Sequence, residues 1–344
     1  MTLISILDFV RITRETDARR ALDNARDLAQ HAEGWGFSRF WVAEHHNYPG
    51  IAGAATAVVL SHVAAGTKDI RVGAGGVMMP NHAPIVVAEQ FGTLAHLFPN
   101  RIDLGLGRAS GSDQRTVRAL RRPMTFNGDL RADVVELQDY FGPVGLSNGV
   151  LAVPSRGTRI PLWILGSSLY GAQLAADLGL RYAFASHFAP DALLPALHAY
   201  RSGFKSSGQE ARPHAMIGVN IVAAETDEEA RRLATTQQMT YSDLVRGTPD
   251  VSKPPIEDID TYWSRTEKAQ VSRMLARSII GSPRTVKDGI AALVAETGAD
   301  ELIIDSDLYD HAKRLRSFEI IADVIRSLGT ETSQKQELRK QTAQ

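Results

Sequence analysis

The fold is decided by residues 70–113, which read IRVGAGGVMMPNHAPIVVAEQFGTLAHLFPNRIDLGLGRASGSD. Alternating apolar residues predict a strand over residues 70–74 that ends in a bend at Gly75-Gly76, where the absence of Cβ frees the backbone. An amphipathic helix follows and stops at a Phe-Pro-Asn turn. A second strand, residues 101–106, then leads into a glycine followed by Arg108. In a parallel sheet both bends lie at the same edge, which is where α/β proteins bind ligands.

The alternation of strand and helix continues on both sides of this stretch. Apolar runs predict eight strands, which begin near residues 3, 37, 70, 101, 160, 181, 215 and 301. Eight βα units in one chain predict an α/β fold, a single (β/α)8 TIM barrel with insertions over residues 1–330, and a doubly wound sheet is the alternative. A closing helix is predicted to end at Leu328, and the polar tail 331–344 is predicted to be disordered.

Composition narrows the classes of function. The chain has 38 Lys plus Arg and 39 Asp plus Glu, and this near-neutral balance argues against nucleic acid or an acidic membrane surface as partner. It contains no cysteine, which excludes disulfides, thiolate metal sites and cysteine nucleophiles. The first residues enter a strand without a basic segment or a long apolar run, so we expect a cytoplasmic protein.

The predicted strand ends are polar or rich in glycine, which favours a binding site at the mouth of the barrel. These strand-end residues are Asp8, Glu44-His45-His46, Gly75-Gly76, Arg108, Gly166-Ser167-Ser168, His187 and Asp305-Asp307. A solvated loop explains any single one of them. Their joint occurrence is harder to explain in that way.

Arg108 is the first candidate for binding an anion. It is followed by the small, hydroxyl-rich turn 109–112, and a guanidinium beside open amides can hold a phosphate. Gly166-Ser167 at the start of a helix offers further amides. The alternatives are a structural salt bridge for Arg108 and simple helix capping for the serines. The dinucleotide fingerprint is matched only weakly, because the last position of residues 105–110 is serine.

His45 and His46 follow Glu44 directly and raise the question of a metal. Adjacent residues on a strand point to opposite faces, and the sequence offers no well-spaced third ligand. We therefore expect no metal here, and a role in proton transfer or hydrogen bonding is favoured for the imidazole.

These segments resemble the bacterial luciferase-like flavin-dependent monooxygenases, a barrel family that also has deazaflavin-dependent members. The resemblance is carried by RFWVAEHH at residues 39–46, by the whole of residues 70–113, and by IPLWILGSS at residues 160–168. It continues in order through most of residues 1–328.

The resemblance implies a flavin site. Arg108 matches the arginine that binds the flavin phosphate, and Gly166-Ser167 matches the amides opposite it. Tyr170 stands where luciferases have a threonine hydroxyl that also holds the phosphate. Gly75-Gly76 matches a non-proline cis peptide under the flavin ring.

The resemblance also implies catalytic roles. His45 matches the histidine that promotes the oxygen chemistry, and Glu44 would orient or support the site. Gly107 stands where luciferase has a reactive cysteine. Oxygen chemistry at a flavin needs a dry pocket, and residues 247–277 are the predicted lid.

The implied function is an FMN-dependent monooxygenase that takes reduced flavin (FMNH2) from a separate flavin reductase and uses O2 on a small organic substrate. A homodimer is expected from the same resemblance. One alternative is an F420-dependent oxidoreductase that transfers hydride, with Arg115, Arg118, Arg121 and Arg122 available for the acidic cofactor tail. Another is a flavin-binding protein without catalytic activity.

Overall fold

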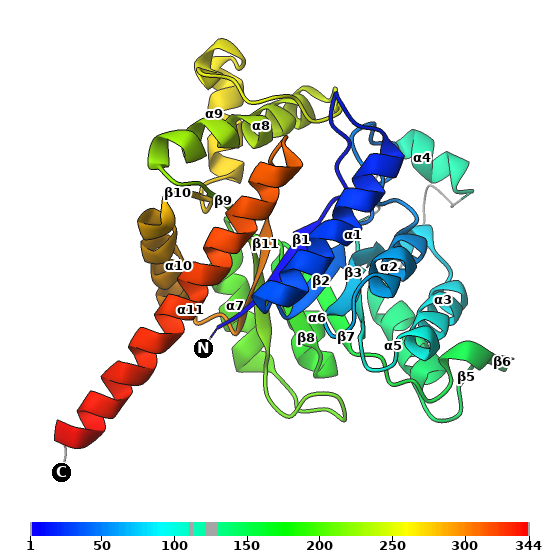
Figure 1. The fold of residues 1–344 in the computed structure, drawn as a ribbon. Coiled ribbons are helices and arrows are strands. Elements are labelled where there is room, and N and C mark those ends of the chain that lie inside the picture. Colours follow the sequence, from blue (N-terminus) through cyan, green and yellow to red (C-terminus); the bar gives the residue numbers. More distant parts are fainter. Residues whose placement is uncertain (1, 110–112, 122–128, 343–344) are drawn as a thin grey trace.

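The computed structural model describes residues 2–109, 113–121 and 129–342. Eight parallel strands form a barrel surrounded by helices (Figure 1). The barrel strands are β1 Leu3–Asp8, β2 Arg39–Val42, β3 Arg71–Met78, β4 Ile102–Gly107, β7 Leu162–Gly166, β8 Arg181–Phe184, β9 Ala215–Ala223 and β11 Glu301–Asp305. The sheet closes because β9 pairs with both β8 and β11, and β11 pairs with β1. The predicted TIM barrel is confirmed, and the doubly wound alternative is wrong.

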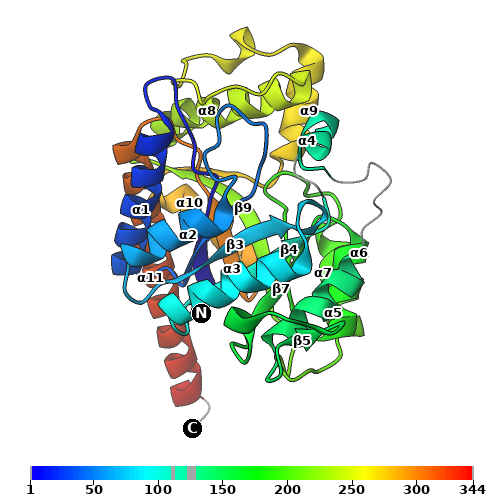
Figure 2. The same ribbon diagram turned by 90° about the vertical axis from the view of Figure 1, so that its right-hand side faces the viewer.

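Helices cover the outside of the barrel, and apolar side chains fill the layer between them and the strands. They are α1 Ala18–Trp35, α2 Thr56–Ala65, α3 Pro84–Leu97, α4 Gln114–Ala119, α5 Leu130–Phe141, α6 Leu169–Leu178, α7 Leu193–Gly203, α8 Asp227–Arg246, α9 Arg265–Met274, α10 Pro283–Thr297 and α11 His311–Thr342. Figure 2 shows α4, α8 and α9 together at one end of the barrel. None of the helices in the described ranges is both long and apolar enough to cross a membrane.

Short elements are added to this frame. β10, Ile279–Gly281, pairs with the end of β9, and β5 and β6, Leu146–Ser147 and Val150–Leu151, form a hairpin outside the barrel. Three 3-10 turns are η1 Met79–Asn81, η2 Val153–Ser155 and η3 Ile259–Thr261. Of these, η1 follows β3 directly and contributes to the site.

Alternate residues of the strands fill the barrel interior in layers. At the amino-terminal end, Arg39 donates from Nη1 to Asp103 at 2.7 Å and from Nε to Glu301 at 2.9 Å, and all three side chains are buried. Above them Trp41 and Trp163 meet edge to face, with ring centroids 5.2 Å apart. The interior is thus packed below the carboxyl ends of the strands, which we call the mouth.

The glycines of β3 and β4 make room for this packing. A Cβ on Gly75 would lie 2.8 Å from Leu7 Cδ1 and 3.1 Å from Trp41 Cε3. A Cβ on Gly105 would lie 2.5 Å from Leu165 Cδ1. The predicted end of the strand at Gly75 is wrong, because β3 runs on to Met78 with a shift in register after Ala74. Core side chains approach the backbone there.

The last helix is longer than predicted. It was expected to end at Leu328, but α11 continues to Thr342 and includes most of the tail predicted to be disordered. Residues 331–342 are mainly Glu, Gln, Lys, Arg and other residues that a helix accepts, and they contain no proline or glycine. The predicted disorder of residues 331–344 stays a prediction.

Candidate active site

The mouth brings together residues from the carboxyl ends of several strands, among them β4 and β7. Gly107 of β4 pairs with Leu165 of β7, so Arg108 and Gly166 follow neighbouring strands at the same edge. This is the arrangement predicted for a phosphate site. Of the turn after Arg108, residues 110–112 lie outside the described residues, as does Arg122.

Arg108 is exposed and lies over the ring of Tyr170, with its Cζ atom 4.5 Å from the ring centroid. Among the described residues it forms no ion pair with an acidic side chain, so the predicted alternative of a structural salt bridge is not seen. Ser168 is the N-cap residue of α6 but makes no side-chain capping hydrogen bond. Among the described residues, the Arg108 guanidinium therefore has no acidic partner and the Ser168 hydroxyl does not cap α6, as an anion site requires.

The peptide bond between Gly75 and Gly76 is cis. The resemblance to the luciferase-like enzymes implied a non-proline cis bond at this position. It lies within β3, beside β4 and below η1.

Glu44 is a buried centre of hydrogen bonds at the mouth. Its Oε1 accepts from Nε2 of His46 and Nε2 of His82, both at 2.8 Å, and from Nδ2 of Asn81 at 3.1 Å. Its Oε2 accepts from the backbone N–H of Met78 at 3.0 Å. Burial by itself would raise the pKa of Glu44, but the hydrogen bonds from His82, Asn81 and Met78 lower it below its ordinary value. Glu44 thus positions the segment after β3.

His45 does not join the hydrogen bonds of Glu44 described above. Because β2 ends at Val42, the alternation of a strand does not set the direction of its side chain. Its ring stacks on Phe9 with centroids 5.6 Å apart and planes at 21°, and it lies 6.0 Å from the ring of Tyr48. Phe9 also meets His187 edge to face at 6.2 Å. His45 therefore belongs to an aromatic group at the mouth, which consists of Phe9, His45, Tyr48 and His187.

His187 is a buried, neutral member of this group. Burial, together with the nearby His45 and Arg11, lowers the pKa of His187 to about 4. Its Nδ1 atom has no hydrogen-bond partner in the described part of the chain.

The pH dependence of stability should reveal this histidine. The unfolded chain takes up the proton below about pH 6.5, whereas folded His187 does so only near pH 4, so acid favours unfolding in that window. We expect the free energy of unfolding of the wild type to rise between pH 4.5 and 7.5 by up to about 3 kcal/mol more than that of His187→Leu. Urea unfolding at both pH values measures this difference. Equal pH slopes in the two proteins would show that His187 is not held neutral.

Asp305 and Asp307 are buried and do not face solvent at the mouth. Arg11 approaches Asp307 at 3.0 Å and Asp305 at 3.6 Å, and Arg314 pairs with Asp8 at 3.0 Å. Burial raises the pKa of Asp305 to about 6, because Arg11 only partly offsets the desolvation and Asp307 adds a like charge. These three predicted strand-end acids therefore form an internal charge cluster.

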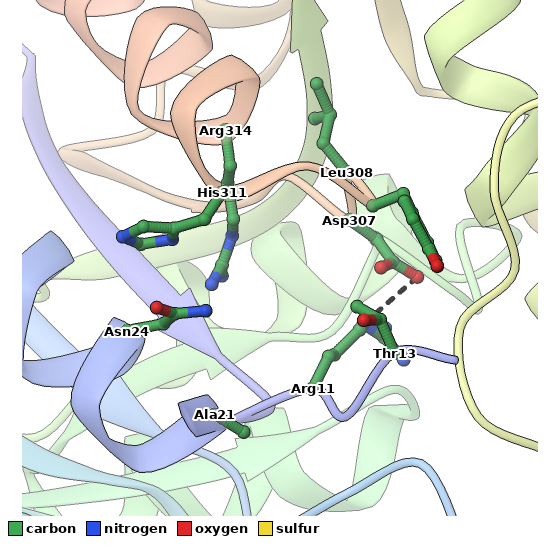
Figure 3. A pocket seen from close by; sticks show the side chains of 9 residues that line it. Arg11, Thr13, Ala21, Asn24, Asp307, Leu308, His311 and Arg314 are labelled. Carbon is green, nitrogen blue, oxygen red and sulfur yellow. Dashed lines mark ion pairs between the residues drawn. The ribbon is translucent and has the colours of Figure 1, made fainter. Parts of the chain in front are cut away.

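A small cavity lies beside this cluster, between the first turns of α1 and α11 (Figure 3). It measures about 20 Å³, and Arg11, Asp307 and Arg314 are among its lining residues. That volume suits a water molecule, whereas cofactor sites are more than ten times larger. The cavity is not a flavin site.

The segment predicted to be a lid pairs with the backbone of residues 12–14. The N–H of Ser252 donates to the carbonyl of Ile12 at 2.9 Å, and the N–H of Arg14 donates to the carbonyl of Ser252 at 3.1 Å. Lys253 pairs with Asp243 of α8. The segment is thus fastened to the barrel by backbone hydrogen bonds, and its role as a lid stays a prediction.

Sequence reasoning missed several residues of the mouth. Asn81 and His82 lie in the short turn between β3 and Pro84, the first residue of α3. Phe9 and Arg11 follow β1. The signal for the first pair was a polar Asn-His step directly after a strand and before a helix-starting proline.

Comparison with known proteins shows the family to which this chain belongs. The sequence model of the luciferase-like monooxygenases matches residues 2–301. The chain belongs to the luciferase-like monooxygenase family. A luciferase-like monooxygenase of Escherichia coli K12 is 49% identical over 321 residues, which are 93% of this chain and 96% of that protein.

Solved structures of luciferase-like proteins have the same fold. The crystal structure of apo-MsnO8 is similar with a TM-score of 0.84 at 31% identity, over 95% of this chain and 99% of that one. At lower identity, the oxygenating constituent of 3,6-diketocamphane monooxygenase from Pseudomonas putida in complex with FMN gives 0.70 at 18%, covering 94% and 97% of the two chains. An F420-dependent secondary alcohol dehydrogenase gives 0.69 at 15%, covering 94% and 99%. These last two show the fold alone.

Proposed function

We propose that this luciferase-like protein is an FMN-dependent monooxygenase, which uses reduced FMN from a separate reductase and O2 to oxidise a small organic substrate. The observation that carries the proposal is Arg108. This exposed guanidinium at the end of β4 lies on Tyr170, has no acidic partner among the described residues, and is next to the end of β7. A guanidinium of this kind binds phosphate through charge-assisted, bidentate hydrogen bonds. We also propose a homodimer, in keeping with the family resemblance.

In this proposal, some residues of the mouth bind the cofactor and others transfer the proton. When bound, reduced FMN would supply the electrons that activate O2. Arg108, with the backbone of Gly166 and Ser167, would hold the phosphate, and the Gly75-Gly76 backbone would lie under the ring. Imidazole nitrogens of His45 would accept or donate the proton, and the rings of Phe9 and Tyr48 beside it would exclude water.

A second candidate function is hydride transfer with F420. The observation that favours it is α4, whose Arg115 and Arg118, with Arg121 just after it, are exposed at the same end of the barrel as α8 and α9 (Figure 2). An acidic cofactor tail would find positive charge there.

Titration of the protein with FMN, reduced FMN, riboflavin and F420 tests both proposals. Calorimetry or flavin fluorescence should show that FMN, oxidised or reduced, binds more tightly than riboflavin, which lacks the phosphate. Preference for F420 would favour hydride transfer, and no binding would contradict both. O2 consumption coupled to substrate oxidation then separates the enzyme from a protein that only stores flavin.

His45→Ala should keep FMN affinity within about threefold and lower substrate oxygenation at least tenfold, because general acid–base groups contribute about 100-fold or more. The measurement is the ratio of oxygenated product to reduced flavin consumed. His96→Ala serves as control, since it removes an exposed histidine of α3. Wild-type coupling in His45→Ala would remove His45 from the mechanism.

A further inference from the structure

Glu44 differs from the other buried acids in the described part of the chain. Each of the others lies within 4.0 Å of an arginine or lysine. They are Asp8, Asp103, Asp243, Glu301, Asp305 and Asp307. The charge partners of Glu44 are His46 and His82, which are cations only when protonated. A buried carboxylate needs a positive partner, because losing water costs several kcal/mol, and buried charges are therefore paired or coordinate metals.

The hydrogen bonds of Glu44 are unevenly distributed. Three N–H donors, from His46, His82 and Asn81, meet on Oε1, whereas Oε2 receives only the N–H of Met78 among the donors that the structure describes. A carboxylate oxygen offers about two lone-pair sites. Oε1 is therefore surrounded by more donors than it can satisfy well, and two of these donors are nitrogens that also ligate metals.

The ligand atoms of the group converge from three places in the sequence. One atom each from Glu44, His46 and His82 lies within 4.8 Å of the others, and this is the only such group of three in the described residues. The side chains of His46 and His82 are 18% and 26% exposed, so an ion can enter from the mouth and keep a position open to water. His82 supplies the third ligand that the local sequence around His46 did not offer.

We propose that Glu44, His46 and His82 bind one divalent transition-metal ion at the mouth of the barrel. Two imidazole nitrogens and one carboxylate oxygen are a ligand set suited to Zn²⁺ or Fe²⁺, with open positions for water. Both imidazoles would ligate through an unprotonated Nε2 and carry a proton on Nδ1, so the Nε2 protons of the two hydrogen bonds to Oε1 leave the ligand atoms when the metal binds. The N–O separations would widen from 2.8 Å to about 3.3 Å, as metal–ligand bonds of about 2.0 to 2.1 Å require. This revises the expectation of no metal, and it does not depend on flavin binding.

The test is titration of the untagged, chelator-treated protein with Co²⁺ alone, followed by visible absorption and calorimetry. We expect one equivalent to bind and to give a d–d absorption band, and Zn²⁺ to displace it. His46→Ala should lower the affinity at least tenfold.

His82→Gln is the decisive variant, because a glutamine amide can still donate to Glu44 but is a poor metal ligand. We expect it to keep the wild-type circular dichroism and melting temperature without metal, and to lose the Co²⁺ band. His96→Ala, which removes an exposed histidine of α3, is the control and should bind Co²⁺ as the wild type does. No stoichiometric Co²⁺ band in the wild type, or an unchanged band in His82→Gln, would overturn the proposal and leave Glu44 as a hydrogen-bonded support only.

Discussion

Replacement of Arg39 by methionine is expected to lower the free energy of unfolding by about 3 to 5 kcal/mol, because it leaves two buried carboxylates without their shared cation. Arg39 donates hydrogen bonds to Asp103 of β4 and to Glu301 of β11. Its guanidinium carbon also lies 5.0 Å from the ring centroid of Trp163. Asp103 keeps Arg71, whereas the partners left to Glu301 in the described part of the chain are hydrogen bonds from Ser5 and His214. The loss should therefore fall mainly on Glu301.

Urea unfolding followed by tryptophan fluorescence measures the effect, since Trp41 and Trp163 lie in the barrel directly above this layer. The matched control is Arg131→Met, which removes an exposed pair with Asp177 and should cost less than about 1 kcal/mol. Arg39→Met combined with Glu301→Gln should recover part of the loss. If Arg39→Met were as stable as Arg131→Met, the two buried carboxylates would not depend on Arg39 for their stability.

Arg108→Ala is expected to weaken FMN binding more than tenfold, because it removes the charge-assisted, bidentate partner of the phosphate. Riboflavin is the matched ligand: its affinity should change less than about twofold, since it has no phosphate for Arg108 to bind. Calorimetric titration of FMN and riboflavin into the wild type and into Arg108→Ala gives the four dissociation constants that this comparison needs.

Tyr170 extends this test. The ring lies 4.5 Å from the Arg108 guanidinium carbon, so Tyr170→Phe should keep FMN affinity and Tyr170→Leu should weaken it a few-fold. Loss of affinity in Tyr170→Phe would instead assign the contact to the hydroxyl. Arg115→Ala, on exposed α4, is the control for a general loss of positive charge. Unchanged FMN affinity in Arg108→Ala would place the phosphate elsewhere.

The sequence by itself determined the architecture. Strand and helix periodicities are local properties, so the eight strands and the alternation of strand and helix followed from short windows such as residues 70–113. The grouping of polar residues at one end of the barrel also followed, because the carboxyl ends of parallel strands share an edge. The assignment of Arg108, Gly166 and Ser167 to a phosphate site stays a prediction.

Only the tertiary structure decided which of those residues meet. Glu44 accepts a hydrogen bond from His82, whereas His45 stacks on Phe9. In the sequence, Glu44, His45 and His82 are all polar residues that follow strands, and nothing distinguishes their partners. Asp305 proved buried against Arg11, some 290 positions earlier. Such contacts join residues that are far apart in the chain, and their partners are selected by barrel closure and by the cost of burying unpaired charge. Neither factor leaves a pattern in a local window of sequence.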